Sequence, residues 1–144
     1  MKKALCVLLG LCMASGAVFA GTLAEDNIEK LKMIAGIFAF RITGGAGDCR
    51  ACHTAMAVPE KAVAVEDFKD IKGRPVPEGR EVAEEFRKQL SANPGIRLAG
   101  PEAEVVISGT LLPYKGRQKW RLSIRAVSST GGVIASYEGL LKRR

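Results

Sequence analysis

The sequence has few of the residues that build catalytic centres. It contains one histidine, His53, and only four cysteines in 144 residues. Cys6 and Cys12 lie within the first twenty residues, which leaves Cys49 and Cys52 for the rest of the chain. A disulfide between two cysteines this near in sequence would enclose a loop too small to stabilise a fold. The single histidine excludes bis-histidine ligation within one chain, and we find no nucleophile elbow or phosphate loop.

Charge is absent from a stretch near the amino terminus, where residues 4–18 are all uncharged. Two lysines precede this stretch, and a Val-Phe-Ala sequence ending at Ala20 offers small residues at the positions that signal peptidase recognises. We therefore predict a signal peptide over residues 1–20 and a mature chain in the periplasm or secreted, with outer-membrane association left open. The stretch is shorter than the roughly 20 residues that span a bilayer, so we expect no transmembrane helix after its removal.

Acidic residues are scarce toward the carboxyl terminus, where Glu138 is the only one after Glu104. Basic residues follow Glu104 at eight positions: Lys115, Arg117, Lys119, Arg121, Arg125, Lys142, Arg143 and Arg144. Without the signal peptide the net charge is (22 − 2) − 15 = +5. Because the chain is exported, we expect no nucleic acid partner. The basic residues form either a solvated surface or a partner-binding patch, for which Lys119, Arg121 and Arg125 are the candidates.

The first segment after the signal predicts a helix over residues 25–42. Apolar residues recur there at helical spacing: Ile28, Leu31, Ala35, Phe38 and Ile42. Met33, Ile34, Ile37 and Phe40 extend this stripe almost around the helix. A helix that is apolar on most sides needs to be covered on most sides. We therefore expect it to pack on the rest of the domain, on a second copy of the chain as a homo-oligomer, or on a cofactor.

The chain beyond residue 60 predicts a small α+β domain over residues 61–144. A buried strand is expected over residues 62–68, and a helix begins at Pro77 with an apolar stripe that ends at Leu90. Further strands are predicted over residues 96–98, 104–112, 119–127 and 133–141, of which three or four run antiparallel. The expected fold is thus an N-terminal helix and a β-α-β-β-β small mixed sheet, with helices packed on one face.

Several segments of this domain carry a resemblance to a known family. They are residues 63–68, the helix that contains Gly79-Arg80 and ends at Leu90, residues 103–109, and residues 121–127 leading to Thr130-Gly131-Gly132. Together they resemble the domain of the flagellar outer-membrane protein O family, with kin in the curli-secretion lipoprotein and the penicillin-binding-protein activator lipoproteins. The resemblance covers about residues 61–141. It implies a non-catalytic binding and assembly module with an envelope protein as its partner.

Residues 21–60 combine the first helix with a loop that carries the motif Cys49-Arg50-Ala51-Cys52-His53. This C-x-x-C-H sequence is the attachment signature of c-type haem. Two thiols separated by two residues reach the two vinyl groups along one edge of the porphyrin, and the following histidine supplies the proximal nitrogen to the iron. The motif therefore predicts one covalent haem c, attached after export.

The sixth ligand of such a haem would be Met33, a lysine or nothing, because no methionine follows Met56. Packing in the core is the alternative role for Met33. Other apolar residues of the first helix could cover one face of the porphyrin or a second copy of the chain: Ile34, Ile37, Phe38 and Phe40.

The sequence therefore predicts an exported c-type monohaem protein built on an envelope binding module. It would transfer electrons or sense redox state or a diatomic ligand, with an envelope or redox protein as its partner. Two alternatives remain open. One is a cofactor-free periplasmic or outer-membrane assembly or accessory module, and the other is a dithiol redox protein that uses Cys49 and Cys52. We expect an electron carrier or binding module rather than an enzyme.

Overall fold

The computed structural model describes residues 23–44, 60–114, 116 and 118–143. Along the chain the elements are α2 (Glu25–Ile42), β1 (Lys61–Val65), α3 (Pro77–Ser91), β2 (Ile96–Leu98), β3 (Val105–Tyr114), β4 (Lys119–Ser128) and β5 (Val133–Lys142). The helix predicted over residues 25–42 is confirmed with the same bounds, and each strand overlaps the segment predicted for it. Neither of the two described helices has the length and apolarity that a bilayer crossing requires.

The five strands form one mixed sheet in the order β2-β1-β3-β4-β5. β1 runs parallel to both β2 and β3, whereas β3, β4 and β5 form an antiparallel meander. The predicted α+β class is confirmed, with three strands in the antiparallel group. β2 pairs in parallel because α3 lies between β1 and β2 and carries the chain back to the end of the sheet where β1 began.

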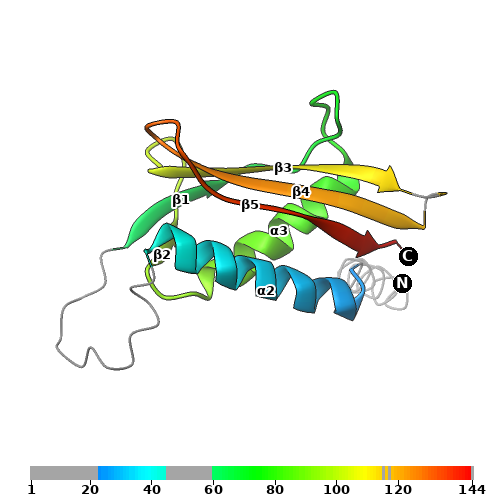
Figure 1. The fold of residues 1–144 in the computed structure, drawn as a ribbon, viewed down its shortest axis with the longest axis horizontal. Helices are drawn as coiled ribbons and strands as arrows, with labels where there is room; N and C mark the ends of the chain where they lie inside the picture. Colours follow the sequence, from blue (N-terminus) through cyan, green and yellow to red (C-terminus); the bar gives the residue numbers. More distant parts are fainter. Residues whose placement is uncertain (1–22, 45–59, 115, 117, 144) are drawn as a thin grey trace, which may run out of the picture.

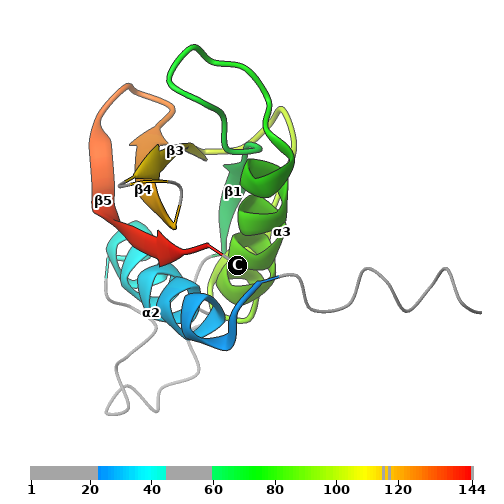
Figure 2. The same cartoon turned by 90° about the vertical axis from the view of Figure 1, so that its right-hand side faces the viewer.

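Both helices pack on the same face of the sheet, as predicted. Figure 1 shows α2 below the strands and α3 crossing them obliquely, and Figure 2 shows both helices from the end of the molecule. Among the residues that the structure describes, no helix covers the opposite face, which we call the open face. The described residues therefore form one helix layer and one sheet layer, and leave the other sheet surface uncovered.

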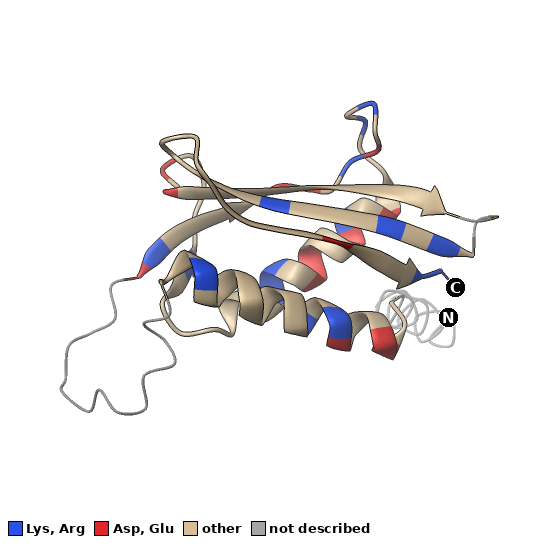
Figure 3. Cartoon of the chain, in the orientation of Figure 1, with Lys and Arg blue, Asp and Glu red and all other residues tan. Residues whose placement is uncertain are grey.

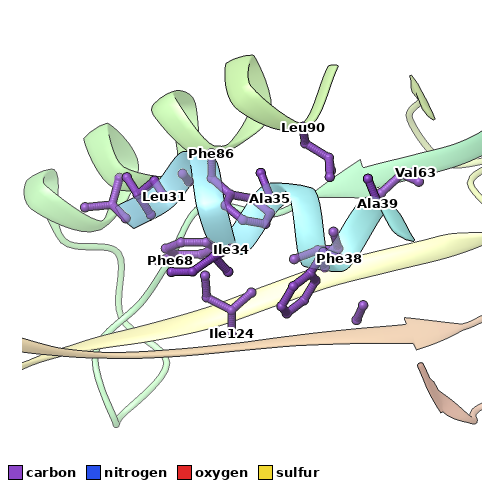
Figure 4. Close-up of a cluster of buried hydrophobic side chains, with 14 of the residues drawn as sticks. Leu31, Ile34, Ala35, Phe38, Ala39, Val63, Phe68, Phe86, Leu90 and Ile124 are labelled. Carbon is purple, nitrogen blue, oxygen red and sulfur yellow. The ribbon is translucent and has the colours of Figure 1, made fainter. Parts of the chain in front are cut away.

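Three aromatic rings from three segments meet between these layers. Phe38 of α2 contacts Phe86 of α3 edge to face, with ring centroids 5.7 Å apart, and Phe68 lies 6.2 Å from Phe86 (Figure 4). Each ring is at most 1% exposed, and burying one contributes about 1.5–3 kcal/mol. Gly109 of β3 makes room for this cluster, since a Cβ there would lie 2.8 Å from the Phe68 ring.

Candidate functional site

The residues of the predicted haem motif, Cys49, Cys52 and His53, lie outside the described residues, as does the predicted signal peptide over residues 1–20. Within residues 23–44, 60–114, 116 and 118–143, no three histidine, cysteine or acidic side chains cluster to hold a metal ion.

Met33 lies on the solvent side of α2, where it is 56% exposed. Core packing, the alternative role for this residue, is therefore wrong. Met33, Ile37 and Phe40 follow one another at spacings of four and three residues, and all three are about half exposed. This spacing places them on one side of the helix, and we call them the apolar stripe. A soluble helix that leaves such a stripe open has surface available for a ligand or a partner.

Ile34 and Phe38 were expected to be able to cover a porphyrin together with Ile37 and Phe40. That expectation is wrong for the first two, because Ile34 is fully buried and Phe38 is 1% exposed in the core. They pack inward because α2 lies directly on the sheet and on α3. Only Ile37 and Phe40, with Met33, remain available on the helix surface.

The three predicted partner-binding residues lie together on the open face. Lys119, Arg121 and Arg125 are exposed on β4, and they alternate with the buried residues Leu122, Ile124 and Ala126. The predicted alternation is therefore confirmed, and it follows from the two-residue period of a strand. Figure 3 shows these basic positions along β4, on a sheet that carries few acidic residues.

Among these cations, Arg121 and Arg125 have different surroundings. The Arg121 guanidinium lies 3.2 Å from the carboxylate of Glu138 on β5, in an exposed ion pair. Arg125 stands between Ser108 of β3 and Ser136 of β5 in the strand register. In the described part of the chain no carboxylate pairs with Arg125. Since exposed pairs contribute at most about 1 kcal/mol, the fold makes little use of either cation.

Aliphatic side chains accompany the cations on the open face. Leu112 of β3 and Leu140 of β5 stand opposite Arg121 in the register, and Val106 on β3 is 38% exposed. Serines occupy the positions on either side of Arg125. Of these side chains, arginine is the type that is enriched at protein interfaces. The open face therefore combines solvent-exposed cations with aliphatic and small polar side chains.

The end of β5 is joined to the first turns of α2. Asn27, which is 3% exposed, donates from its side-chain nitrogen to the carbonyl of Lys142 (2.8 Å) and accepts from the Lys142 amide (3.0 Å). Lys30 donates to the carbonyl of Leu140 at 2.7 Å. A hydrogen bond from the Lys142 side chain lowers the pKa of Asp26 below its ordinary value. These contacts satisfy the outer edge of β5 at its carboxyl end.

Sequence reasoning missed the role of Asn27 and the exposed edge of β5. Asn27 and Lys142 are 115 residues apart, and a polar residue in a helix gives no sign of so distant a partner. The open face was found because the alternation of basic and apolar residues over 119–127 is a local signal.

No protein-family model matches the chain, and no curated protein matches it. Solved structures with a similar fold include the LpoB C-terminal domain from Salmonella enterica and the LpoB C-terminal domain from Escherichia coli. Each is 12% identical to this chain, with a TM-score of 0.45, and covers 74% of this chain and 98% of its own length. With similarity this low, the function has to be inferred from the residues of the chain itself.

Proposed function

We propose that this chain is an extracytoplasmic binding module that docks an envelope or redox protein on the open face of its sheet. The observation that carries the proposal is that Lys119, Arg121 and Arg125 project from a sheet face that no described helix covers. The extracytoplasmic location rests on the export signal over residues 1–20.

The charge on this face indicates the kind of partner. The mature chain has a net charge of (22 − 2) − 15 = +5, and Arg121 and Arg125 are solvated rather than held in the core. A partner surface rich in carboxylates would be attracted at a distance and would replace the water around these guanidinium groups. Since arginine binds carboxylates with two parallel hydrogen bonds, it also fixes the orientation of the partner.

A pair of charge reversals on the open face tests the proposal. The chain is immobilised, its partner is captured from the native cell envelope, purified and identified, and the affinity of the two is measured at several salt concentrations. Arg121→Glu with Arg125→Glu should abolish binding, because both attractive contacts become repulsive. The control is Lys88→Glu on α3 with Lys32→Glu on α2, which changes the net charge equally at exposed helix positions away from the open face. An equal loss of affinity in both double variants, or no loss in either, would count against docking on this face.

The C-x-x-C-H motif favours a second function within the same chain, that of a c-type monohaem protein for electron transfer or for sensing of redox state or a diatomic ligand. Cys49 and Cys52 would form the two thioethers and His53 would be the proximal ligand, on the strength of their spacing. The apolar stripe fits this group, because α2 ends at Ile42, shortly before the motif, and leaves Met33, Ile37 and Phe40 uncovered. A bound haem would supply one-electron chemistry, and exposed Met33 is the candidate sixth ligand.

Intact mass and visible absorbance of the natively expressed protein test the haem. We expect a mass that includes one covalent haem and lacks residues 1–20, and an absorbance band that disappears in Cys49→Ser. Met33→Ala should shift the absorbance spectrum if the Met33 sulfur binds the iron. Met56→Ala is the matched control and should leave the spectrum unchanged. An unmodified mass with two free thiols would rule the haem out. A reversible Cys49–Cys52 disulfide with turnover of a disulfide substrate would support the dithiol alternative instead.

A second copy of the chain is the alternative occupant of the apolar stripe. Sedimentation of the apo and haem-loaded protein distinguishes the two uses. If the stripe covers haem, the loaded protein is a monomer, and Ile37→Glu shifts the absorbance spectrum of the covalently attached haem. If the stripe forms a dimer through α2, Ile37→Glu dissociates the dimer and leaves the spectrum unchanged.

A further inference from the structure

The outer edge of β5 carries backbone groups that have no partner among the described residues. β5 is the last strand of the sheet, and Figure 2 shows it at the margin of the molecule. At the carboxyl end of β5, the backbone carbonyls of Leu140 and Lys142 and the Lys142 amide form hydrogen bonds with the Lys30 and Asn27 side chains. These backbone groups therefore point away from β4. Outward groups recur at every second residue of an edge strand, so those of Ser136 and Glu138 point outward as well. No described residue donates to or accepts from these two backbones.

The usual protections against strand addition stand only near the two ends of this edge, where Lys142 closes β5 and a register irregularity between Ala126 and Val127 of β4 faces its first residues. Natural edge strands are commonly blocked by lysine, by proline or by a covering helix. Residues 133–141 contain no lysine and no proline, and Glu138 is their only charged residue. In the described part of the chain, the side chains of α2 form hydrogen bonds with this edge at Leu140 and Lys142. The open part of the edge, residues 135–139, can therefore pair with an additional strand.

The charges near this edge select the occupant. Arg125 is paired with Ser136 of β5 in the strand register. Because serine is small, it does not block the path over the open face from Arg125 to the outer edge of β5. A strand added outside β5 would lie two strand spacings from β4, about 10 Å. A glutamate on that strand would meet the Arg125 guanidinium above Ser136. A second copy of the chain has a net charge of (22 − 2) − 15 = +5 and would be repelled from this basic surface. Charge complementarity therefore favours an acidic segment.

We propose that an extended, acidic segment of the partner adds to the sheet at residues 135–139 of β5 and places a carboxylate on Arg125. Backbone hydrogen bonds to Ser136 and Glu138 provide the register, and Arg125 provides the preference for acidic sequence. The inference rests on the proposed function, because it specifies how the partner engages the open face.

The probe is a synthetic decapeptide of alternating glutamate and valine, and the readout is amide hydrogen exchange of the full mature protein. Binding should slow exchange at the amides of Ser136 and Glu138 and leave the outward amide of Leu98, on the other edge strand, unchanged. The same peptide with lysine in place of glutamate should not bind. Arg125→Gln should weaken binding by about tenfold, the worth of one charge-assisted hydrogen bond, and Arg97→Gln should not change it.

Ser136→Pro provides a second test, since it removes one outward amide from the edge. Where circular dichroism shows a native fold, this variant should also lose binding. If it fails to fold, exchange protection in the wild-type protein and the Arg125→Gln affinity still decide the question. No binding of the glutamate peptide, or binding without protection of Ser136 and Glu138, would overturn strand addition. The docking proposal stands or falls separately, on the charge-reversal pair and the captured native partner.

Discussion

The two faces of one sheet differ in what their side chains do. On β4, Ile124 faces the helices and is 1% exposed, whereas its neighbour Arg125 lies in solvent on the open face. On β3, Ile107 is fully buried and Ser108 beside it lies on the open face next to Arg125. The covered face thus holds the fold together, and the open face is available for binding. The same ten-residue strand serves both purposes because its side chains alternate.

The largest effect should come from removing a ring that the covered face buries. Phe38→Ala should lower the free energy of unfolding by about 3–5 kcal/mol, because it leaves a cavity beside Phe86. Phe40→Ala, on the exposed side of the same helix, is the control and should change stability by about 0.5 kcal/mol or less. Urea unfolding measures both, and equal losses would mean that α2 does not pack as described.

A smaller loss should follow from crowding the same layer. A Cβ on Gly109 would lie 2.8 Å from both the Phe68 ring and the carbonyl oxygen of Ser123. Gly109→Ala should therefore cost about 1–3 kcal/mol of unfolding free energy. Gly132→Ala is the control, since a Cβ there would meet its nearest atom, the Ser128 hydroxyl, at 3.5 Å. A Gly109→Ala protein as stable as wild type would contradict the close packing of Phe68 on β3.

Substitution on the open face should leave stability nearly unchanged. Arg125→Gln removes a charge that has no carboxylate partner in the described part of the chain, so the free energy of unfolding should change by about 0.5 kcal/mol or less. Affinity for the partner should fall in the same variant. A loss of stability as large as that of Gly109→Ala would show that the fold depends on Arg125, and the contrast between the faces would fail.

The smallest effect should appear in a turn that belongs to neither face. Backbone amides of Arg74 and Lys72 donate to the Asp70 carboxylate, and the pKa of Asp70 is lowered chiefly by the bond from Arg74. A carboxyl whose folded pKa is below its unfolded value of about 3.9 stabilises the fold above that pH. The contribution is lost as the pH falls through the folded pKa. Asp70→Asn should slightly flatten the acid limb of a thermal-melting profile, whereas an unchanged limb would show that the turn is not sensitive to pH.

Much of the fold could be predicted from local patterns. The bounds of α2 and the alternation in β4 follow from the 3.6-residue and two-residue periods of their apolar residues. The side on which α2 packs could not be predicted, because its apolar residues extend almost around the helix. Met33 could therefore be assigned either to the core or to a ligand, and only the packing of α2 on the sheet shows it at the surface.

Only part of the candidate site could be predicted from the sequence. The cations at 119, 121 and 125 were found from sequence, since a basic strand face is visible as a pattern. The open edge of β5 was not found, because strand order depends on pairing between residues far apart in the chain. The link from Asn27 to Lys142, which covers only one end of that edge, is also a long-range contact.

The contrast between the two faces is tested most directly by nuclear magnetic resonance of the labelled mature protein during titration with its purified partner. We expect the side-chain signals of Arg121 and Arg125 and the amides of β4 and β5 to move, while those of α3 stay in place. Shifts confined to α2 and α3, with both arginine signals unchanged, would contradict docking on the open face.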